Sequence, residues 1–315
     1  MRAAILALTL ALTACEQQAS TQSALSGAPE QIALAPTNLP AFFDCLRENS
    51  QTVISAHRGG PARGYPENSI EAMAHTIAET PAILEVDVGV IGDDTLVLMH
   101  DETANRTTNG RGDIDRMSLE EFQALQLRDE SGALLDMHPP TLRQALDWAA
   151  GKAVLALDVK RSVSYEDVVE VVQAAGAMDR VIFITYSANA AARMARVAPQ
   201  AMLFVTIESA DDLSELARRD VDLSRVVAWT GVDEPNASLN IALAQAGVET
   251  SFGTLGGTNS WDARFERAGQ DQYAVFADTG LQVISTDRPA AALADLDAND
   301  GVENGYGALR CVHAY

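Results

Sequence analysis

The chain has 315 residues, with 44 acidic and 22 basic side chains, so its formal net charge is −22. Hydrophobic residues make up 47% of it, which is enough to bury a large core and excludes a wholly disordered chain. The acid excess argues against binding to nucleic acid or to an anionic membrane surface, because both need clustered Lys and Arg. A small anionic substrate stays open, because a bound metal ion can reverse the sign of the local field.

The first residues have the layout of an export signal. Arg2 precedes an apolar run, Ala3–Leu12, which is too short to span a bilayer as a helix. The run ends in Leu12-Thr13-Ala14-Cys15, which resembles the bacterial lipoprotein box. We therefore expect an exported protein with a lipid anchor on Cys15, an ordinary signal peptide being the alternative. Glu16 after the cysteine favours the outer membrane, with the protein on the periplasmic side.

We expect three segments along the chain: a lipoprotein signal at residues 1–14, a flexible tether at 15–40 and one folded domain at 41–315. The tether is rich in Gln, Ser, Ala and Pro, a composition typical of flexible linkers. No other segment is apolar and long enough to predict a membrane span.

From Thr52 onward, β-rich apolar runs alternate with helical patterns. The predicted strands are Val53–His57, Ile83–Val90, Val154–Lys160, Val181–Tyr186, Met202–Ile207, Val226–Gly231, Val248–Thr254 and Gln282–Thr286. The predicted helices include Ser69–Glu79, Tyr165–Ala175, Ala188–Val197, Ala210–Arg219 and Ser238–Ala246. Strands that alternate with helices indicate parallel βαβ units, and eight such strands predict a (β/α)₈ TIM barrel. The alternative is a doubly wound open sheet, but no Gly-rich phosphate loop follows the first strand.

Two features interrupt this alternation after the second strand. A short turn at Gly92-Asp93-Asp94 leads to a further strand-like run, Thr95–His100, which predicts an antiparallel hairpin with His100 opposite about Asp87. Residues 102–140 then contain no barrel strand, so we expect them to form a small insertion over one end of the barrel. Within the insertion, Ser118 with Glu121 three residues later predicts a helix start.

Two cysteines, Cys45 and Cys311, lie near the ends of the predicted folded domain. The first and last elements of a closed barrel are neighbours, and an exported protein enters an oxidising compartment. We therefore predict a disulfide between them; two unpaired structural cysteines are the alternative.

Charged residues gather where the predicted strands end, which is where barrel enzymes build their sites. Glu85 and Asp87 lie two residues apart on one strand and so share a face, and Asp158 lies on the next predicted barrel strand. Three converging carboxylates repel one another, and a hard cation such as Mg²⁺ or Ca²⁺ relieves the repulsion. Salt bridges to Arg58 or Lys160 are the alternative for any single carboxylate.

The neighbouring residues suit chemistry on a phosphodiester. His57 ends the first strand and His100 returns on the hairpin, and two histidines can remove and deliver a proton near neutral pH. Arg58 and Lys160 beside a metal oppose the charge that builds on phosphoryl oxygens. A glycosidase needs two carboxylates at a set distance and neither a metal nor an arginine.

These motifs together resemble the glycerophosphodiester phosphodiesterase family. The matching segments, in the family's order, are His57-Arg58-Gly59, Tyr65-Pro66-Glu67-Asn68-Ser69, Glu85-Val86-Asp87-Val88, His100-Asp101, Arg106-Thr107-Thr108-Asn109-Gly110, Leu157-Asp158-Val159-Lys160 and Ser285-Thr286-Asp287-Arg288-Pro289. The resemblance implies hydrolysis of glycerophosphodiesters to glycerol 3-phosphate and an alcohol on a (β/α)₈ barrel, with one Ca²⁺ or Mg²⁺ ion. It also implies attack on phosphorus by the substrate's own neighbouring hydroxyl.

Carried over residue by residue, the resemblance assigns each candidate a role. The implied metal ligands are Glu85, Asp87 and Asp158, the implied acid/base pair is His57 and His100, and the implied phosphate ligands are Arg58 and Lys160. The sequence departs from the family at Asp158, where the third ligand is usually Glu, and at Ser251–Gly257, where the family commonly carries Trp-Thr-Val-Asn. The first departure leaves the metal's identity open, and the second leaves the substrate open.

Two other functions remain open at this stage. One is a non-catalytic lipoprotein that captures phosphorylated solutes, although binding alone does not need both His57 and His100. The other is an exported phosphodiesterase that acts on lipid or on a cell-envelope polymer.

Overall fold

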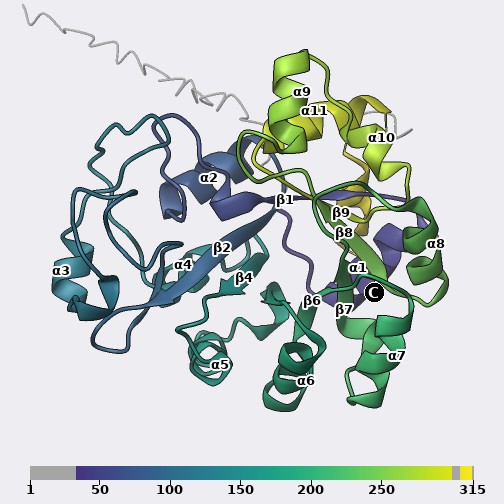
Figure 1. Ribbon diagram of the computed structural model, residues 1–315, viewed down its shortest axis with the longest axis horizontal. Coiled ribbons are helices and arrows are strands. Elements are labelled where there is room, and N and C mark those ends of the chain that lie inside the picture. The colour runs from purple at the N-terminus through teal and green to yellow at the C-terminus, as the bar shows by residue number, and fades with distance from the viewer. Residues whose placement is uncertain (1–32, 300–305, 314–315) are drawn as a thin grey trace, which may run out of the picture. The chain divides into compact units, whose positions relative to one another are not determined.

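The computed structural model describes residues 33–299 and 306–313, and within them eight parallel strands close into a barrel (Figure 1). The strands are β1 (Val53–Ala56), β2 (Ile83–Val90), β4 (Leu155–Val159), β5 (Val181–Thr185), β6 (Met202–Thr206), β7 (Val226–Trp229), β8 (Glu249–Gly253) and β9 (Val283–Thr286). Strand β1 pairs in parallel with both β2 and β9, which closes the sheet. The (β/α)₈ barrel is confirmed, and the open doubly wound sheet is excluded.

Helices cover the outside of this barrel. They are α1 (Leu39–Glu48), α2 (Ile70–Glu79), α4 (Leu142–Ala149), α5 (Tyr165–Ala174), α6 (Ala188–Val197), α7 (Asp211–Arg218), α8 (Ala237–Gln245), α9 (Trp261–Ala268), α10 (Tyr273–Ala277) and α11 (Pro289–Asn299). The strands are buried on both faces, as in Leu155–Val159, because helices cover one face and barrel-filling side chains cover the other. Ser69 caps α2 by accepting the Ala72 N–H.

The hairpin and the insertion follow β2, as predicted. Strand β3 (Leu96–Leu98) runs antiparallel to β2, with Val88 opposite Leu98. This register places Met99, not His100, opposite Asp87. The turn is centred on Asp93, and the next residue, Asp94, adopts a left-handed conformation and donates its N–H to the carbonyl of Ile91. The predicted pairing of His100 with Asp87 was therefore one residue off.

The insertion carries its own small apolar core. Ile91 and Val97 of the hairpin pack with Ile114 and Phe122, which come from the 3₁₀ turn η2 (Ile114–Arg116) and helix α3 (Leu119–Gln123). The predicted capping box at the start of α3 is present, with Ser118 and Glu121 bonded reciprocally. These loops gather beside the barrel around α3 (Figure 1).

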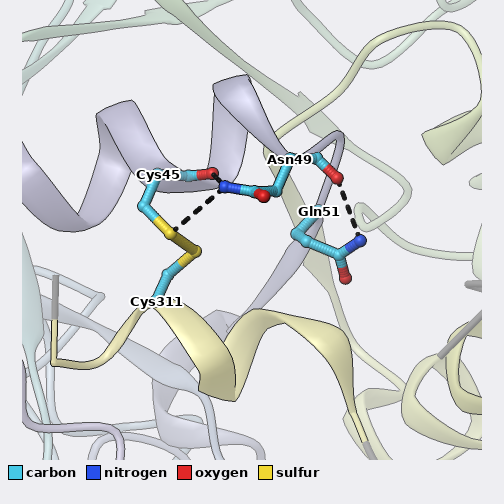
Figure 2. Close-up of a disulfide and its surroundings, with 4 residues drawn as sticks. All are labelled: Cys45, Asn49, Gln51 and Cys311. Carbon is cyan, nitrogen blue, oxygen red and sulfur yellow. Dashed lines mark hydrogen bonds between the residues drawn. A yellow bond between two sulfur atoms is a disulfide. The ribbon is translucent and has the colours of Figure 1, made fainter. Parts of the chain in front are cut away.

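Helix α1 closes the N-terminal end of the barrel and is joined to the end of the described chain. Its Arg47 Nε lies 2.7 Å from Oε1 of Glu249, the first residue of β8. Its Cys45 forms a disulfide with Cys311 in the 3₁₀ segment η5 (Gly307–Cys311), and Asn49 donates a hydrogen bond to the Cys45 carbonyl (Figure 2). The predicted disulfide is confirmed.

Composition predicts that the tether ends at residue 40. In the structure, residues before 40 already pack against the barrel. Leu34 is 1% exposed and forms a bridge with Ala153, and α1 begins at Leu39. The predicted signal and the lipid-anchor site at Cys15 lie outside the described residues. Within the described ranges, no helix combines the length and the hydropathy needed to cross a membrane.

Candidate functional site

The site begins at the tight turn that ends β1. Arg58 has φ 51° and ψ 33°, a left-handed conformation that turns its N–H toward Glu85, and that N–H donates to Oε2 at 2.7 Å. Thr76 of α2 stabilises the turn, because its hydroxyl donates a hydrogen bond to the carbonyl of Gly59. A side chain at Gly60 has no room, because a Cβ there would lie 2.2 Å from Thr76 Oγ1. The turn therefore binds one carboxylate through the main chain and not through the arginine side chain.

The three carboxylates predicted to converge do so at the C-terminal ends of β2 and β4. Asp87 and Asp158 are direct register partners, and Glu85 lies two residues before Asp87 on the same face. One oxygen from each lies within 4.8 Å of the others, and none of the three residues is more than 9% exposed. Burial, together with the charge of Asp87, raises the pKa of Glu85 to about 8.

Cations and amides hold two of these carboxylates. Lys160 Nζ lies 2.5 Å from Asp87 Oδ1 and 2.7 Å from Asp158 Oδ2. Asn68 Nδ2 donates to Asp87 Oδ2 at 2.6 Å. Burial alone would raise the pKa of Asp87, but Lys160 and Asn68 hold it below the ordinary value. Tyr186 donates its hydroxyl to Asp158 Oδ1 at 2.8 Å, and both burial and that carboxylate raise the pKa of the phenol.

The carboxylate cluster fits a hard divalent cation. Its donors are all oxygens, which Ca²⁺ and Mg²⁺ prefer. Lys160 forms ion pairs with Asp87 and Asp158, and Arg58 Nε lies 3.7 Å from Asp87, but within the described residues no cation forms an ion pair with Glu85. A cation held by Glu85, Asp87 and Asp158 would compensate the charge of Glu85.

Each predicted histidine is held by a carboxylate through Nδ1. His57 Nδ1 lies 2.6 Å from Asp287 Oδ1, and His100 Nδ1 lies 2.7 Å from Asp101 Oδ1. Burial alone would lower the pKa of His57, but the bond to Asp287 and the charge of Glu85 raise it. A proton held between Nδ1 and a carboxylate leaves Nε2 free to exchange protons with a substrate.

The carboxylates that hold the histidines are themselves fixed. Asp287 accepts the Gly256 N–H at 3.1 Å, and its own N–H donates to the buried Asp262 at 2.7 Å. Asp101 accepts two hydrogen bonds from Arg106, which also bonds Glu67. These bonds, mainly the one to the guanidinium of Arg106, lower the pKa of Asp101 to about 2.

All seven predicted site residues lie at this end of the barrel, but reasoning from the sequence missed several of their partners. Asp287, Arg106 and Asn68 were noticed only as parts of matching motifs. For Asp287 a signal existed, because it is a charged residue directly after the last strand, the same criterion that identified His57. Arg58 also contacts an unpredicted partner, with Nη1 3.1 Å from Glu67 Oε1.

Two hollows of different character adjoin His57. A pocket of about 150 Å³ reaches from Glu85 and Asp158 to the aromatic rings of Phe204 and Trp229. A larger hollow of about 730 Å³ also includes His57 and is lined mostly by charged residues, among them Arg58, Glu67, Arg106, Arg128, Glu130 and Arg288.

The fold and the site together define a class of protein. It is a barrel with an acidic cluster that could hold a metal ion, and with two histidines bonded to carboxylates, at the C-terminal ends of its strands. Residues 57–289 match the model of the "Glycerophosphoryl diester phosphodiesterase family", and the chain belongs to this family.

Individual relatives agree with this assignment. A crystal structure of a glycerophosphoryl diester phosphodiesterase from Parabacteroides distasonis superposes with a TM-score of 0.77 at 26% identity, covering 88% of this chain and 96% of that one. The uncharacterized protein YqiK of Bacillus subtilis is 34% identical over 47% of this chain and 63% of its own. A glycerophosphodiester phosphodiesterase of Caldanaerobacter subterraneus is 32% identical over 36% of this chain and 47% of its own. The chain thus spans about half to two thirds of the length of these two curated relatives.

Proposed function

We propose that this protein hydrolyses glycerophosphodiesters to glycerol 3-phosphate and an alcohol, with one divalent cation, Ca²⁺ or Mg²⁺, at Glu85, Asp87 and Asp158. The observation that carries the proposal is the pair of histidines, each bonded through Nδ1 to a carboxylate, at the end of the barrel that carries the acidic cluster. Family membership and the named relatives support the same reaction.

Different residues of the site would transfer protons and bind the phosphate in this reaction. With Nδ1 bonded to Asp287, His57 can take up or deliver a proton at Nε2, and His100 can act in the same way with Asp101 behind it. Arg58 and Lys160 are cations at the rim of the cluster and would bind the phosphoryl oxygens. The bound cation would supply charge stabilisation for the same oxygens.

No protein nucleophile stands out beside either histidine. Among the residues that the structure describes, the hydrogen bonds of both rings run through Nδ1 to carboxylates and none joins Nε2 to a hydroxyl or thiol. This pattern supports attack by a hydroxyl of the substrate itself.

The test uses the purified protein and glycerophosphocholine, with and without Ca²⁺ or Mg²⁺, coupled to detection of glycerol 3-phosphate. We expect metal-dependent product that disappears in His57→Ala. Binding without turnover would favour the solute-capturing lipoprotein. Release of product only from lysolipids or envelope polymer would favour the exported enzyme that acts on those substrates.

We further propose that the protein is exported and anchored in the cell envelope through a lipid on Cys15. The tetrapeptide before that residue supports the anchor, and a disulfide between Cys45 and Cys311 is a bond typical of oxidising compartments. Incorporation of labelled palmitate into the wild type but not into Cys15→Ser is the expected result. Equal labelling of both would refute the anchor.

A further inference from the structure

Glu67 is a carboxylate to which the proposed function assigns no role. It lies in the segment before α2, and its side chain is 11% exposed. Two arginines from different parts of the chain bond it: Arg58 from the turn after β1, and Arg106 from the insertion. Burial alone would raise the pKa of Glu67, but the bond from Arg106 and the charge of Arg58 hold it below the ordinary value. The barrel and the insertion therefore share one charged carboxylate.

Within the described residues, Glu67 is the only group that hydrogen-bonds the guanidinium of Arg58. Nη1 of Arg58 donates to both Oε1 and Oε2 of Glu67 at 3.1 Å. Nε of the same guanidinium lies 3.7 Å from Asp87 Oδ2, which is too far for a hydrogen bond, and no other described group bonds it. Because Arg58 is a proposed phosphate ligand, the position of a phosphate-binding cation depends on Glu67.

Glu67 is also connected to His100. Arg106 donates from Nη1 and Nη2 to the two oxygens of Glu67, at 2.7 and 2.8 Å. The same guanidinium donates from Nε and Nη2 to the two oxygens of Asp101, at 2.8 Å each. Asp101 in turn bonds Nδ1 of His100 at 2.7 Å. A planar guanidinium with two paired contacts has a fixed orientation, so it holds Glu67 and Asp101 in a set arrangement.

The main chain next to Glu67 is fixed by its neighbour Asn68. The Asn68 N–H donates to the carbonyl of Arg58 at 2.9 Å. Its side chain donates to Asp87 Oδ2 at 2.6 Å and accepts the Asp87 N–H at 2.9 Å. Asn68 is 3% exposed and has a left-handed φ of 57°, which asparagine adopts more readily than most residues. Glu67 thus extends from a segment that is bonded both to the turn after β1 and to β2.

We infer that Glu67 is a positioning residue that links the phosphate-binding Arg58 to the proton-transferring His100. This inference rests on the proposed function, which assigns those two roles. Glu67 orients Arg58 by a direct bond. It orients His100 through two intermediates, Arg106 and Asp101. The alternative is that the two arginines only fasten the insertion to the barrel, in which case the link contributes to stability and not to catalysis.

The test uses substitutions that keep the charge and change the geometry. Glu67→Asp keeps the carboxylate and shortens its reach by one CH₂. Glu67→Gln is less suitable, because removing a negative charge would by itself strengthen the binding of phosphate. Arg106→Lys keeps the positive charge and loses the planar fork that bonds two carboxylates. Glu266→Asp is the matched control, because Glu266 lines the same hollow and its carboxylate has no hydrogen bond or ion pair within the described residues.

Three quantities are measured for the Mg²⁺-loaded protein: the wild type, each single variant and the double variant Glu67→Asp, Arg106→Lys. Steady-state kinetics with glycerophosphocholine gives kcat and KM. Calorimetry with inorganic phosphate gives the affinity for the anion, independently of turnover. Thermal melts give the Tm and show that each variant is folded at the assay temperature.

We expect Glu67→Asp to weaken phosphate binding about three- to tenfold, the cost of ordering one long side chain, and to raise KM by a similar factor. It should also lower kcat about three- to tenfold through a less ordered His100. Arg106→Lys should lower kcat by the same factor and leave phosphate affinity within about twofold, because Arg58 keeps its bond to Glu67. In the Arg106→Lys background, Glu67→Asp should not lower kcat further. The control should match the wild type.

Two results would overturn the inference. If Glu67→Asp lowers only the Tm and keeps normal kcat and phosphate affinity, the arginines merely fasten the insertion. If the losses in kcat multiply in the double variant, Glu67 and Arg106 act independently and no link exists. Should Glu67→Asp fail to fold, Arg106→Lys tests the same link at an exposed residue, and an unchanged kcat there would refute it. A wild type that hydrolyses no glycerophosphodiester would instead refute the proposed function, and calorimetry would still show whether Glu67 positions Arg58.

Discussion

Replacing Asp287 by Asn should disable His57 while preserving the shape of the site. Asp287 Oδ1 lies 2.6 Å from His57 Nδ1, and Oδ2 accepts the Gly256 N–H. An asparagine must keep its oxygen toward Gly256, because an amide NH₂ cannot accept a hydrogen bond. Its NH₂ group would then face His57, and the imidazole would have to accept at Nδ1 and carry its proton on Nε2. That tautomer cannot take a proton from the substrate.

The expected loss follows from the role of His57. A positioned general base contributes on the order of 10²–10⁴ to the rate, so we expect kcat to fall by that factor with little change in KM. The pH dependence has a definite sign. Burial lowers the pKa of His57, but the bond to Asp287 and the charge of Glu85 raise it overall. Removing the Asp287 charge lowers the pKa of His57. The acidic limb of the pH–rate profile of the residual activity should therefore move to lower pH.

The assay is steady-state release of glycerol 3-phosphate across a range of pH. Asp271→Asn is the control, because Asp271 pairs with Arg288, the residue next to Asp287, and is not bonded to His57. The control should retain normal kcat. If Asp287→Asn stays within threefold of the wild type, Asp287 does not set the tautomer and His57 has another role.

Three further predictions concern the cluster, the disulfide and Arg106. Because burial and Asp87 raise the pKa of Glu85 from 4.5 to about 8, its contribution to stability is complete below pH 4.5 and is lost as the pH rises through 8. The Tm of the metal-free protein should therefore fall over this range, and Ca²⁺ or Glu85→Gln should flatten the curve; equal slopes would contradict the account. The double variant Cys45→Ser, Cys311→Ser should lose about 3–5 kcal/mol of unfolding free energy in denaturant titrations, because the bond spans 266 residues, and keep its kcat at 25 °C. Loss of kcat in the folded variant would mean that the disulfide influences the site. Arg106→Gln removes the main cause of the low pKa of Asp101 and should lower kcat about tenfold through a less ordered His100. Unchanged kcat would show that Asp101 alone orients that ring.

Most of the barrel strands could be predicted because they are runs of apolar residues with helical patterns on either side. Segments whose structure depends on distant packing could not. Helix α1 begins at Leu39, directly after a stretch rich in small and polar residues, and it is held by Arg47 on Glu249 and by the disulfide. The one-residue error in the hairpin arose because turn geometry, here the left-handed Asp94, decides the register.

In the site, too, some residues could be predicted from local sequence and others could not. Charged residues in otherwise apolar strand ends identified His57, Glu85, Asp87 and Asp158, because burying charge is costly and is rarely accidental. The partners come from loops and depend on how those loops close. Asn68 reaches Asp87 from the turn before α2. Tyr186 is 62% exposed, and nothing in its sequence context indicates its bond to Asp158.

The bond between His57 and Asp287 lies on the seam where the barrel closes, because β1 and β9 are its first and last strands. The two residues are 230 positions apart, so this contact joins the end of the first barrel strand to the end of the last one. Loosening of the seam would separate the histidine from its carboxylate while most of the sheet remained paired. We therefore expect activity to disappear before the far-ultraviolet circular dichroism changes as denaturant is added.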